Sequence, residues 1–333
     1  MQYRTRCLQS LKYKAANGIG GLPLILARSM LPRILMFIDV LCLLGVALAA
    51  LTITLIARMI LRPPRMTDGK AMYLLHRLSP GDLGLNFENQ NFTIRDAQND
   101  KPLTIAGWWI PAHLQSGRCA VLLHGYADAK VGSIAWAPML HDMEINVLAI
   151  DLRAHGESGG RYSTAGYWER HDLEQVIDQL KAMHSAQTEK LILFGASLGA
   201  AVAAAVAAGR DDLNAVVLDS PFTDYRRAVA AHIRLLGLPG GWLLGAALSL
   251  AEFLSGSKFD AVRPIDTIRQ IRCPLLIVLG DQDELLDPHE VAALRAATKN
   301  VAVVNDVSHL MAMQADPVGY ALRIRNFLDS IPA

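Results

Sequence analysis

Leu191-Ile192-Leu193-Phe194-Gly195-Ala196-Ser197-Leu198-Gly199 is the stretch of this 333-residue chain that decides the fold. Its first four residues are apolar, which predicts a buried strand. The alanine-rich run from Gly199 to Ala208 predicts a helix of small residues that packs closely against its neighbours. The pattern Gly-x-Ser-x-Gly therefore lies in a sharp turn between a strand and a helix.

This turn meets the requirements of a nucleophile elbow. Gly195 and Gly199 stand where a Cβ atom would be crowded, and Ser197 is held at the tip of the turn. The N-terminus of the following helix points at the serine oxygen, where its positive potential favours developing negative charge. A plain Gly/Ser turn is the alternative, since so short a pattern also arises by chance. The rest of the chain decides between the two.

Composition excludes several classes of protein. The formal net charge is only +1, and no basic patch or nucleic-acid motif is present, so no nucleic-acid partner is expected. Apolar residues make up 52% of the chain, which is high for a soluble domain and is explained by a membrane segment. The four cysteines, Cys7, Cys42, Cys119 and Cys273, lack Cys-x-x-Cys spacing and are expected to be free thiols.

The N-terminal part of the chain predicts a membrane anchor. Residues 1–33 are basic and contain no acid, and residues 34–61 are apolar except for Asp39 and Arg58. The apolar run is long enough for a transmembrane helix, with an organelle transit sequence or a core helix as alternatives. Basic residues flank both ends, so they do not set its orientation. We expect residues 1–61 to anchor the protein and to contribute nothing to its chemistry.

Residues 62–90 contain Pro63, Pro64, Pro80 and Gly81, and they predict a linker with one short helix near 71–78. From residue 91 the pattern changes. Runs at 92–95 and 103–110 predict an antiparallel hairpin. Beyond it, apolar runs expected to form strands (119–123, 146–150, 191–194, 215–218, 275–279, 301–304) alternate with expected helices (134–143, 167–184, 198–208, 289–298, 317–330).

This alternation predicts an α/β fold over residues 91–333, with a mostly parallel central sheet and helices on both faces. An insertion at about 224–271 is expected to form a small helical lid. Its runs at 235–244 and 245–254 are apolar almost all round, so they must be buried, face a pocket or touch lipid. Two alternatives stay open: the lid covers the edge of the sheet, or it contacts an apolar substrate or the membrane.

Functional groups in an open parallel sheet collect beyond the carboxyl ends of the strands. Acidic residues follow the strand at 275–279, and His309 follows the strand at 301–304, so the chain order is serine, acid, histidine. We favour Asp283 as the acid, because it lies three residues beyond Gly280 and can turn back over the sheet. The other candidates are Asp281, Glu284, Asp287 and, outside this loop, Asp219, which is more simply explained as a turn former.

A serine nucleophile also needs two backbone donors for the oxyanion. The N–H of Leu198, directly after Ser197, is the first candidate. The second is the N–H of Tyr126 in the loop that follows the strand at 119–123. Gly125 allows a tight turn there, and His124 is expected to be structural.

These motifs, taken together and in order, resemble the α/β-hydrolase superfamily from about Phe92 to the C-terminus. The resemblance implies that Asp151 and Arg153 are structural, and Ala154 stands where the superfamily usually has a glycine. The matching segments are His124-Gly125-Tyr126, Asp151 to Ser158, Gly195 to Gly199, Asp219-Ser220-Pro221-Phe222, Gly280 to Asp283, and His309. With the N-terminal anchor, they resemble the branch of membrane-tethered lipases, thioesterases and acyl-protein hydrolases; some related proteins are peptidases.

The sequence therefore predicts a single-pass membrane serine hydrolase that cleaves an ester or thioester of a small-molecule or lipid acyl substrate. Ser197 is the expected nucleophile, His309 the base and then the acid, and Asp283 the group that orients His309. Neither a metal nor a cofactor is expected. A serine peptidase or an acyltransferase with the same triad is an alternative. So is a catalytically silent scaffold, although an intact triad argues against it. The residues do not select the substrate, the compartment or the oligomeric state.

Overall fold

The computed structural model describes residues 21–331, which fall into two compact units that divide between Thr54 and Leu55. Cys7 and the first 20 residues of the basic N-terminal segment lie outside the described residues. One helix, α2 (Gly21–Leu61), crosses the division. Its part Pro32–Leu61 reaches a mean hydropathy of 2.7 and is long enough to cross a membrane.

Helix α2 ends at Leu61, directly before Arg62-Pro63-Pro64, because proline lacks an amide donor and keeps the preceding residue out of the helical region. The larger unit begins with the last turns of this helix, in which Ile56, Ala57, Ile60 and Leu61 are buried. Residues 62–90, which we expected to be a linker, also belong to this unit. They contain α3 (Asp68–Leu75) and the 3₁₀ helix η1 (Pro80–Leu83).

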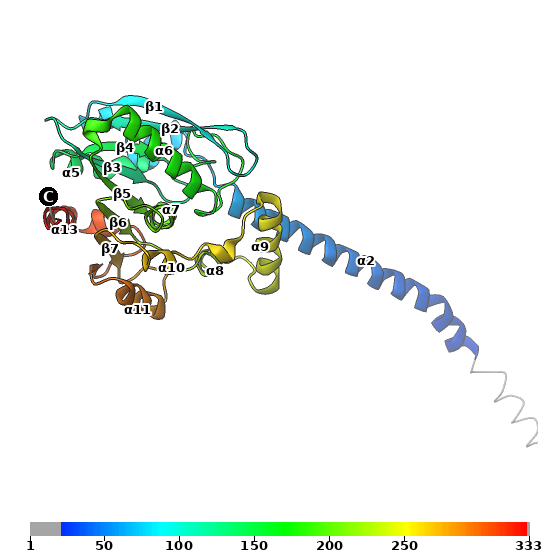
Figure 1. Ribbon diagram of the computed structural model, residues 1–333. Coiled ribbons are helices and arrows are strands. Elements are labelled where there is room, and N and C mark those ends of the chain that lie inside the picture. Colours follow the sequence, from blue (N-terminus) through cyan, green and yellow to red (C-terminus); the bar gives the residue numbers. More distant parts are fainter. Residues whose placement is uncertain (1–20, 332–333) are drawn as a thin grey trace, which may run out of the picture. The chain divides into compact units, whose positions relative to one another are not determined.

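Eight strands form one sheet in the order β1-β2-β4-β3-β5-β6-β7-β8 (Figure 1). The hairpin β1–β2 is antiparallel as predicted, β2 pairs antiparallel with β4, and all other neighbours are parallel. The fold prediction of a mostly parallel α/β-hydrolase sheet is confirmed. The strands are β1 (Glu88–Arg95), β2 (Pro102–Ile110), β3 (Arg118–Leu123), β4 (Asn146–Ile150), β5 (Lys190–Ala196), β6 (Ala215–Asp219), β7 (Leu275–Gly280) and β8 (Val301–Val304).

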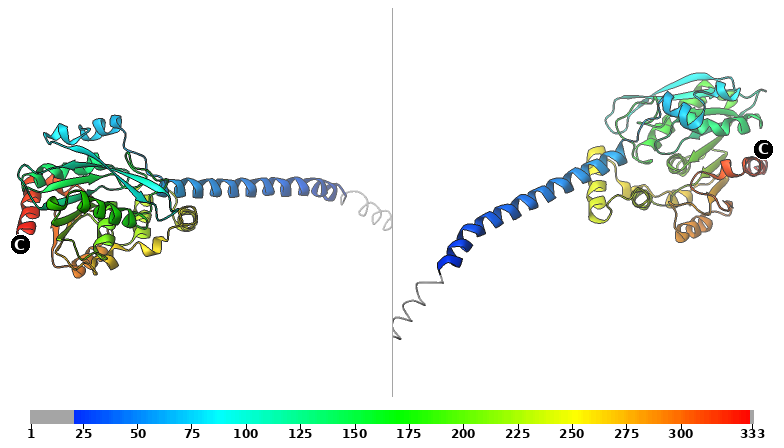
Figure 2. Two further views of the ribbon diagram at one scale, coloured as in Figure 1. Left: turned by 45° about the horizontal axis from the view of Figure 1, so that its top comes forward. Right: turned by 180° about the vertical axis from the view of Figure 1, so that it is seen from behind.

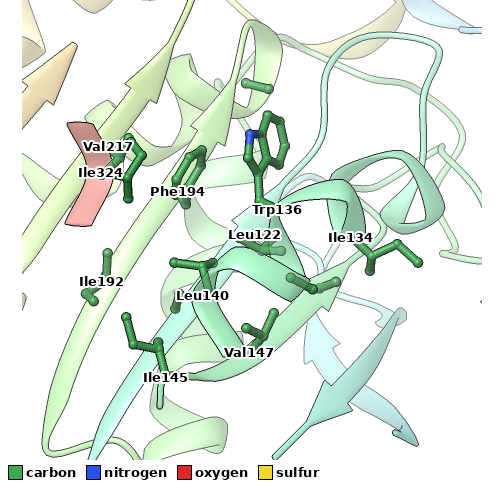
Figure 3. Close-up of a cluster of buried hydrophobic side chains, with 14 of the residues drawn as sticks. Leu122, Ile134, Trp136, Leu140, Ile145, Val147, Ile192, Phe194, Val217 and Ile324 are labelled. Carbon is green, nitrogen blue, oxygen red and sulfur yellow. The ribbon is translucent and has the colours of Figure 1, made fainter. Parts of the chain in front are cut away.

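Helices cover both faces of the sheet (Figures 1 and 2). Strand residues such as Leu122, Phe194 and Val217 share one buried cluster with Leu140 and Ile324 (Figure 3). The helices on this face include α4 (Lys130–Ser133), α5 (Ala137–His141), α12 (Ala312–Ala315) and α13 (Pro317–Asp329). The other face carries α6 (Glu169–Met183), α7 (Leu198–Ala207), α10 (Pro264–Ile268) and α11 (Pro288–Ala297).

The helix expected at 134–143 is divided into the 3₁₀ helix η2 (Ile134–Trp136) and α5, and α4 precedes it. Pro138 is the physical reason. It has no amide to donate to the carbonyl of Ile134, which instead accepts from Ala137 in a tighter turn.

The insertion between β6 and β7 is helical, as expected for the lid. It contains α8 (Tyr225–Leu235), α9 (Gly241–Ser255), the 3₁₀ helix η4 (Phe259–Ala261) and α10. Helices α8 and α9, drawn in yellow tones, lie outside the layers of the sheet (Figure 2). One face of α9 is buried through Ala247, Leu248 and Ala251, whereas Trp242 and Phe253 are exposed by 69% and 84%.

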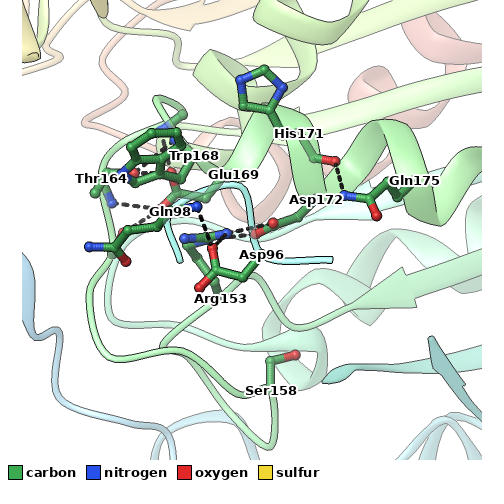
Figure 4. A network of polar contacts seen from close by, with 12 residues as sticks. Asp96, Gln98, Arg153, Ser158, Thr164, Trp168, Glu169, His171, Asp172 and Gln175 are labelled. Atoms are coloured by element: carbon green, nitrogen blue, oxygen red, sulfur yellow. Dashed lines mark hydrogen bonds and ion pairs between the residues drawn. The ribbon is translucent and has the colours of Figure 1, made fainter. Parts of the chain in front are cut away.

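A buried ion-pair network fixes the loop after β4 (Figure 4). The guanidinium of Arg153 donates to Asp172 of α6 at 2.5 and 2.6 Å and to Asp96, which follows β1, at 2.9 Å. All three side chains are almost fully buried. A buried cation costs free energy unless it is paired, so this network holds the loop, the hairpin and α6 in one arrangement.

Candidate active site

Ser197 lies between β5 and α7 with φ 48° and ψ −105°, a backbone conformation that side chains rarely adopt. The glycines on either side are required by close backbone contacts. A Cβ atom at Gly195 would lie 2.3 Å from the carbonyl oxygen of Gly199, and one at Gly199 would lie 2.2 Å from that of Leu123. The turn thus has the geometry of a nucleophile elbow.

His309 follows β8 and lies between Ser197 and Asp283. Its Nε2 is 2.9 Å from the Oγ of Ser197, and its Nδ1 is 2.7 Å from Oδ2 of Asp283. With the proton on Nδ1, the ring donates to the carboxylate and accepts from the serine hydroxyl. The structure therefore brings together the three side chains that the sequence singled out, although 112 residues separate Ser197 from His309.

Each of the other acids of the loop after β7 has a different contact. Asp281 accepts from the amide of Val307 at 3.3 Å, and Asp287 caps α11 by accepting from Glu290 N at 2.9 Å. Glu284 accepts from the backbone amide of His309 at 3.3 Å and does not meet the ring. Asp283 alone among these four bonds to the imidazole, and its second oxygen accepts from Leu285 N at 3.0 Å.

Asp219, the outside candidate, ends β6 and is buried beside the site. Its carboxylate accepts from the hydroxyl of Tyr320 at 2.7 Å and from Ser220 Oγ at 3.0 Å. Burial raises the pKa of Asp219 above its usual value, although these two hydroxyl bonds oppose the rise. Ser220 in turn accepts from the amide of Leu310 at 3.1 Å, so Asp219 supports the loop that carries His309.

The two expected oxyanion donors lie at the same cavity as Ser197 and His309. Leu198 is the first residue of α7, and an amide in the first turn of a helix has no intrahelical partner. Tyr126 follows Gly125, at which an added Cβ atom would lie only 3.8 Å from Cβ of Ser197. The loop after β3 therefore passes directly beside the nucleophile.

His124 has the structural place expected of it. Its Nε2 accepts from Leu152 N at 2.9 Å, and its Nδ1 lies 2.7 Å from the carbonyl oxygen of Gly125. Burial lowers the pKa of His124 to about 3, and the neighbouring His155 adds to this shift. The ring is therefore neutral near pH 7 and joins the loops after β3 and β4.

A cavity of about 200 Å³ adjoins Ser197 and His309. Its other walls are mostly apolar or aromatic and come from α2, α8, the start of α7, and the loops after β3, β6, β7 and β8. These residues are Met59, Ile60, Tyr126, Leu198, Phe222, Tyr225, Ala228, Val229, His232, Ile233, Leu285 and Leu310.

Sequence reasoning missed most of this wall. Met59 and Ile60 lie in the segment that we expected to act as an anchor, and this segment also lines the cavity. Within the lid, α8 lines the cavity, whereas the strongly apolar run of α9 does not. For α8 the sequence could have predicted the buried face, because its apolar residues recur on one side of the helix. Helix α2 is apolar on every face, so its sequence does not indicate which face is buried.

Comparison with known proteins relates this chain to known hydrolases. A family model described as serine aminopeptidase, S33, matches residues 116–262. The uncharacterised protein YqkD of Bacillus subtilis is 25% identical over 234 residues, which cover 68% of this chain and 76% of that protein. The uncharacterised protein YfhR of Escherichia coli K12 is 28% identical over 235 residues, which cover 68% and 74% of the two chains.

Among solved structures, the Pyrococcus furiosus esterase Pf2001 is 26% identical, with a TM-score of 0.67 over 82% of this chain and 99% of the esterase. The chain belongs to the α/β-hydrolase superfamily, and these similarities support a hydrolase activity.

Proposed function

We propose that the protein is a membrane-anchored serine hydrolase that cleaves an ester or thioester bond of an apolar acyl substrate. The observation that carries this proposal is the unbroken hydrogen-bonded path from Ser197 through His309 to Asp283 at the end of an apolar cavity. A hydroxyl is a weak nucleophile until a base removes its proton, and this path supplies both the base and the group that orients it.

In the proposed reaction, the Oγ of Ser197 attacks the acyl carbonyl while its proton passes to Nε2 of His309. The amides of Tyr126 and Leu198 stabilise the oxyanion of the tetrahedral intermediate. Collapse of the intermediate breaks the bond to the leaving group, which departs as an alcohol or thiol with the proton from His309. Water then attacks the acyl-enzyme by the same route and releases the carboxylic acid and Ser197.

The lining of the cavity supports an acyl substrate over an aminopeptidase substrate. An aminopeptidase needs a group that binds the α-ammonium of its substrate, and acidic side chains do this best. Among the described residues that line the cavity, none is Asp or Glu. Phe222, Tyr225, Val229 and Ile233 instead offer an apolar surface that favours a hydrocarbon chain.

Ser197→Ala tests the assignment. In full-length protein in detergent, a fluorophosphonate should label wild type and leave the alanine variant unlabelled. Hydrolysis of a panel of acyl esters should fall by several orders of magnitude, because a triad member is removed. Labelling of the variant at the wild-type rate rules out Ser197 as the nucleophile. A wild type that neither labels nor cleaves any ester favours the silent scaffold, and cleavage of peptides alone favours a peptidase.

The membrane anchor is proposed from Pro32–Leu61, whose length and mean hydropathy of 2.7 suit a single span. The side chains of this stretch up to Leu55 are largely exposed in the described structure, as those of a lipid-facing helix would be. The full-length protein should stay in the membrane fraction after a carbonate wash. Its recovery in the soluble fraction would remove the anchor from the proposal.

A further inference from the structure

The C-terminal turn of α2 is joined to the loops around the active site. Tyr126, whose amide is a proposed oxyanion donor, donates its hydroxyl hydrogen to the carbonyl oxygen of Met59. Two residues further along, the carbonyl oxygen of Leu61 accepts from Ser163 N at 2.9 Å. Hydrogen bonds from these two loops to backbone carbonyls of α2 therefore hold the helix end, in addition to apolar contacts.

The residues directly after the helix strengthen this attachment. Arg65 donates to the carbonyl oxygens of His155, Gly156 and Ser158 at 3.1, 2.6 and 2.8 Å. The guanidinium of Arg62 lies 5.4 Å from the ring centre of Tyr162. These contacts all reach the chain after β4, which Arg153 fixes in turn. The last turn of α2 is therefore a fixed part of the larger unit.

Burial separates the two faces of this turn. Ile56, Ala57, Ile60 and Leu61 are exposed by 5% or less, whereas Leu55 is exposed by 56%. Met59 is half-buried and, with Ile60, lines the cavity that also holds Ser197 and His309. An apolar side chain at a cavity wall sets how much hydrocarbon the cavity accepts.

We infer that the last turn of α2 is a wall of the acyl-binding cavity, and that Met59 determines the length of acyl chain that the enzyme accepts. This inference rests on the proposed function and names a specificity residue for it. The helix that carries the apolar N-terminal stretch thus also shapes the substrate site. The side chain of Met59 has no part in the proposed chemical step, so its substitution should change the chain-length profile.

The test compares acetate, butyrate, octanoate and dodecanoate esters with full-length protein in detergent. Met59→Trp should fill the cavity and lower kcat/KM for octanoate and dodecanoate by about tenfold or more relative to acetate. Met59→Ala should move the preference towards longer chains. Leu55→Trp is the matched control, because it makes a comparable change on the exposed face of the same helix and should leave the profile as in wild type.

The outcomes distinguish the inference from the proposed function. If Met59→Trp and Met59→Ala retain the wild-type chain-length profile, or lower every ester equally, Met59 is not a selectivity residue, while labelling of Ser197 still supports the hydrolase. If Met59→Trp does not fold, Met59→Ala decides alone. If wild type neither labels nor cleaves any ester, the proposed function fails, and the inference fails with it.

Discussion

Three aspartates follow β7 within a few residues, and each has a different partner in the structure. Asp283→Asn should lower kcat by about 10⁴-fold, because an amide holds the wrong histidine tautomer and does not stabilise the imidazolium. Asp281→Asn should cost little activity, since Asp281 bonds only a backbone amide. Steady-state kinetics on the panel of esters measure the difference.

Asp287→Asn is the matched control for charge in the same loop. Asp287 caps α11, and asparagine is also a good N-cap, so stability should change by only a few tenths of a kcal/mol. Equal losses of kcat in all three variants would contradict the assignment of Asp283. Asp219 would then be the next acid to test, because it is buried beside the same loop.

His124 gives a prediction about pH. Its pKa is lowered by burial to about 3 in the folded protein, whereas an unfolded chain binds the proton near pH 6.5. Between these values the unfolded state holds more protons, so stability rises with pH. The contribution is complete above about pH 6.5 and is lost as pH falls, at up to about 1.4 kcal/mol per pH unit.

His124→Gln should therefore be less stable than wild type at pH 8 but should lose less stability between pH 7 and pH 5. Urea unfolding at several pH values measures this slope. Burial also lowers the pKa of His155, so part of the slope should remain in the variant. If the free energy of unfolding falls as steeply between pH 7 and pH 5 in the variant as in wild type, His124 does not contribute to this pH dependence.

At the scale of elements, α9 and the turn before it allow a matched pair of glycine substitutions. Gly245 lies inside α9 and Gly237 lies before it, and a Cβ atom at either position would meet nothing within 4 Å. They differ in backbone: Gly237 has φ +65°, a conformation that disfavours other residues.

Gly245→Ala should therefore raise the free energy of unfolding by about 0.5–1 kcal/mol through helix propensity. Gly237→Ala should lower it by about 1 kcal/mol, since alanine is strained in the left-handed region. Thermal unfolding of the two variants and of wild type shows whether each substitution raises or lowers the free energy of unfolding. A destabilised Gly245→Ala would mean that α9 packs against something through this face.

The elements that could be predicted from the sequence are those in which apolar residues alternate with, or are bounded by, polar residues. Apolar or β-rich runs between polar segments predicted all eight strands, and the distance of Asp283 beyond Gly280 predicted its contact with His309. The helix at 134–143 was wrong as a single element, because Pro138 breaks its hydrogen bonding. The cavity wall at Met59 and Ile60 was missed because α2 is uniformly apolar, and burial in such a helix depends on tertiary contacts.

At the scale of the whole molecule, the boundary of the larger unit has consequences for truncation. A variant that begins at Leu55 keeps the buried turn of α2, whereas one that begins at Thr67 loses Ile56, Ile60 and Leu61. Fully burying one such side chain is worth about 1.5–3 kcal/mol, so the shorter variant should be less stable by several kcal/mol. It should also lose Met59 from the cavity.

Urea unfolding and the ester panel compare the two truncated variants with the full chain. The variant that begins at Leu55 should keep the stability and the chain-length profile of wild type. If both truncated variants have the same stability and the same chain-length profile, the end of α2 is not a structural part of the larger unit.

The position of β8 at the edge of the sheet also bears on the order in which parts of the site form during synthesis. Ser197 is synthesised 112 residues before His309, and within residues 21–331 the strand that precedes His309 pairs only with β7. During synthesis His309 therefore emerges after the rest of the sheet has left the ribosome. If Ser197 and His309 form the proposed catalytic pair, we expect the nascent chain to lack hydrolase activity until the final strand docks.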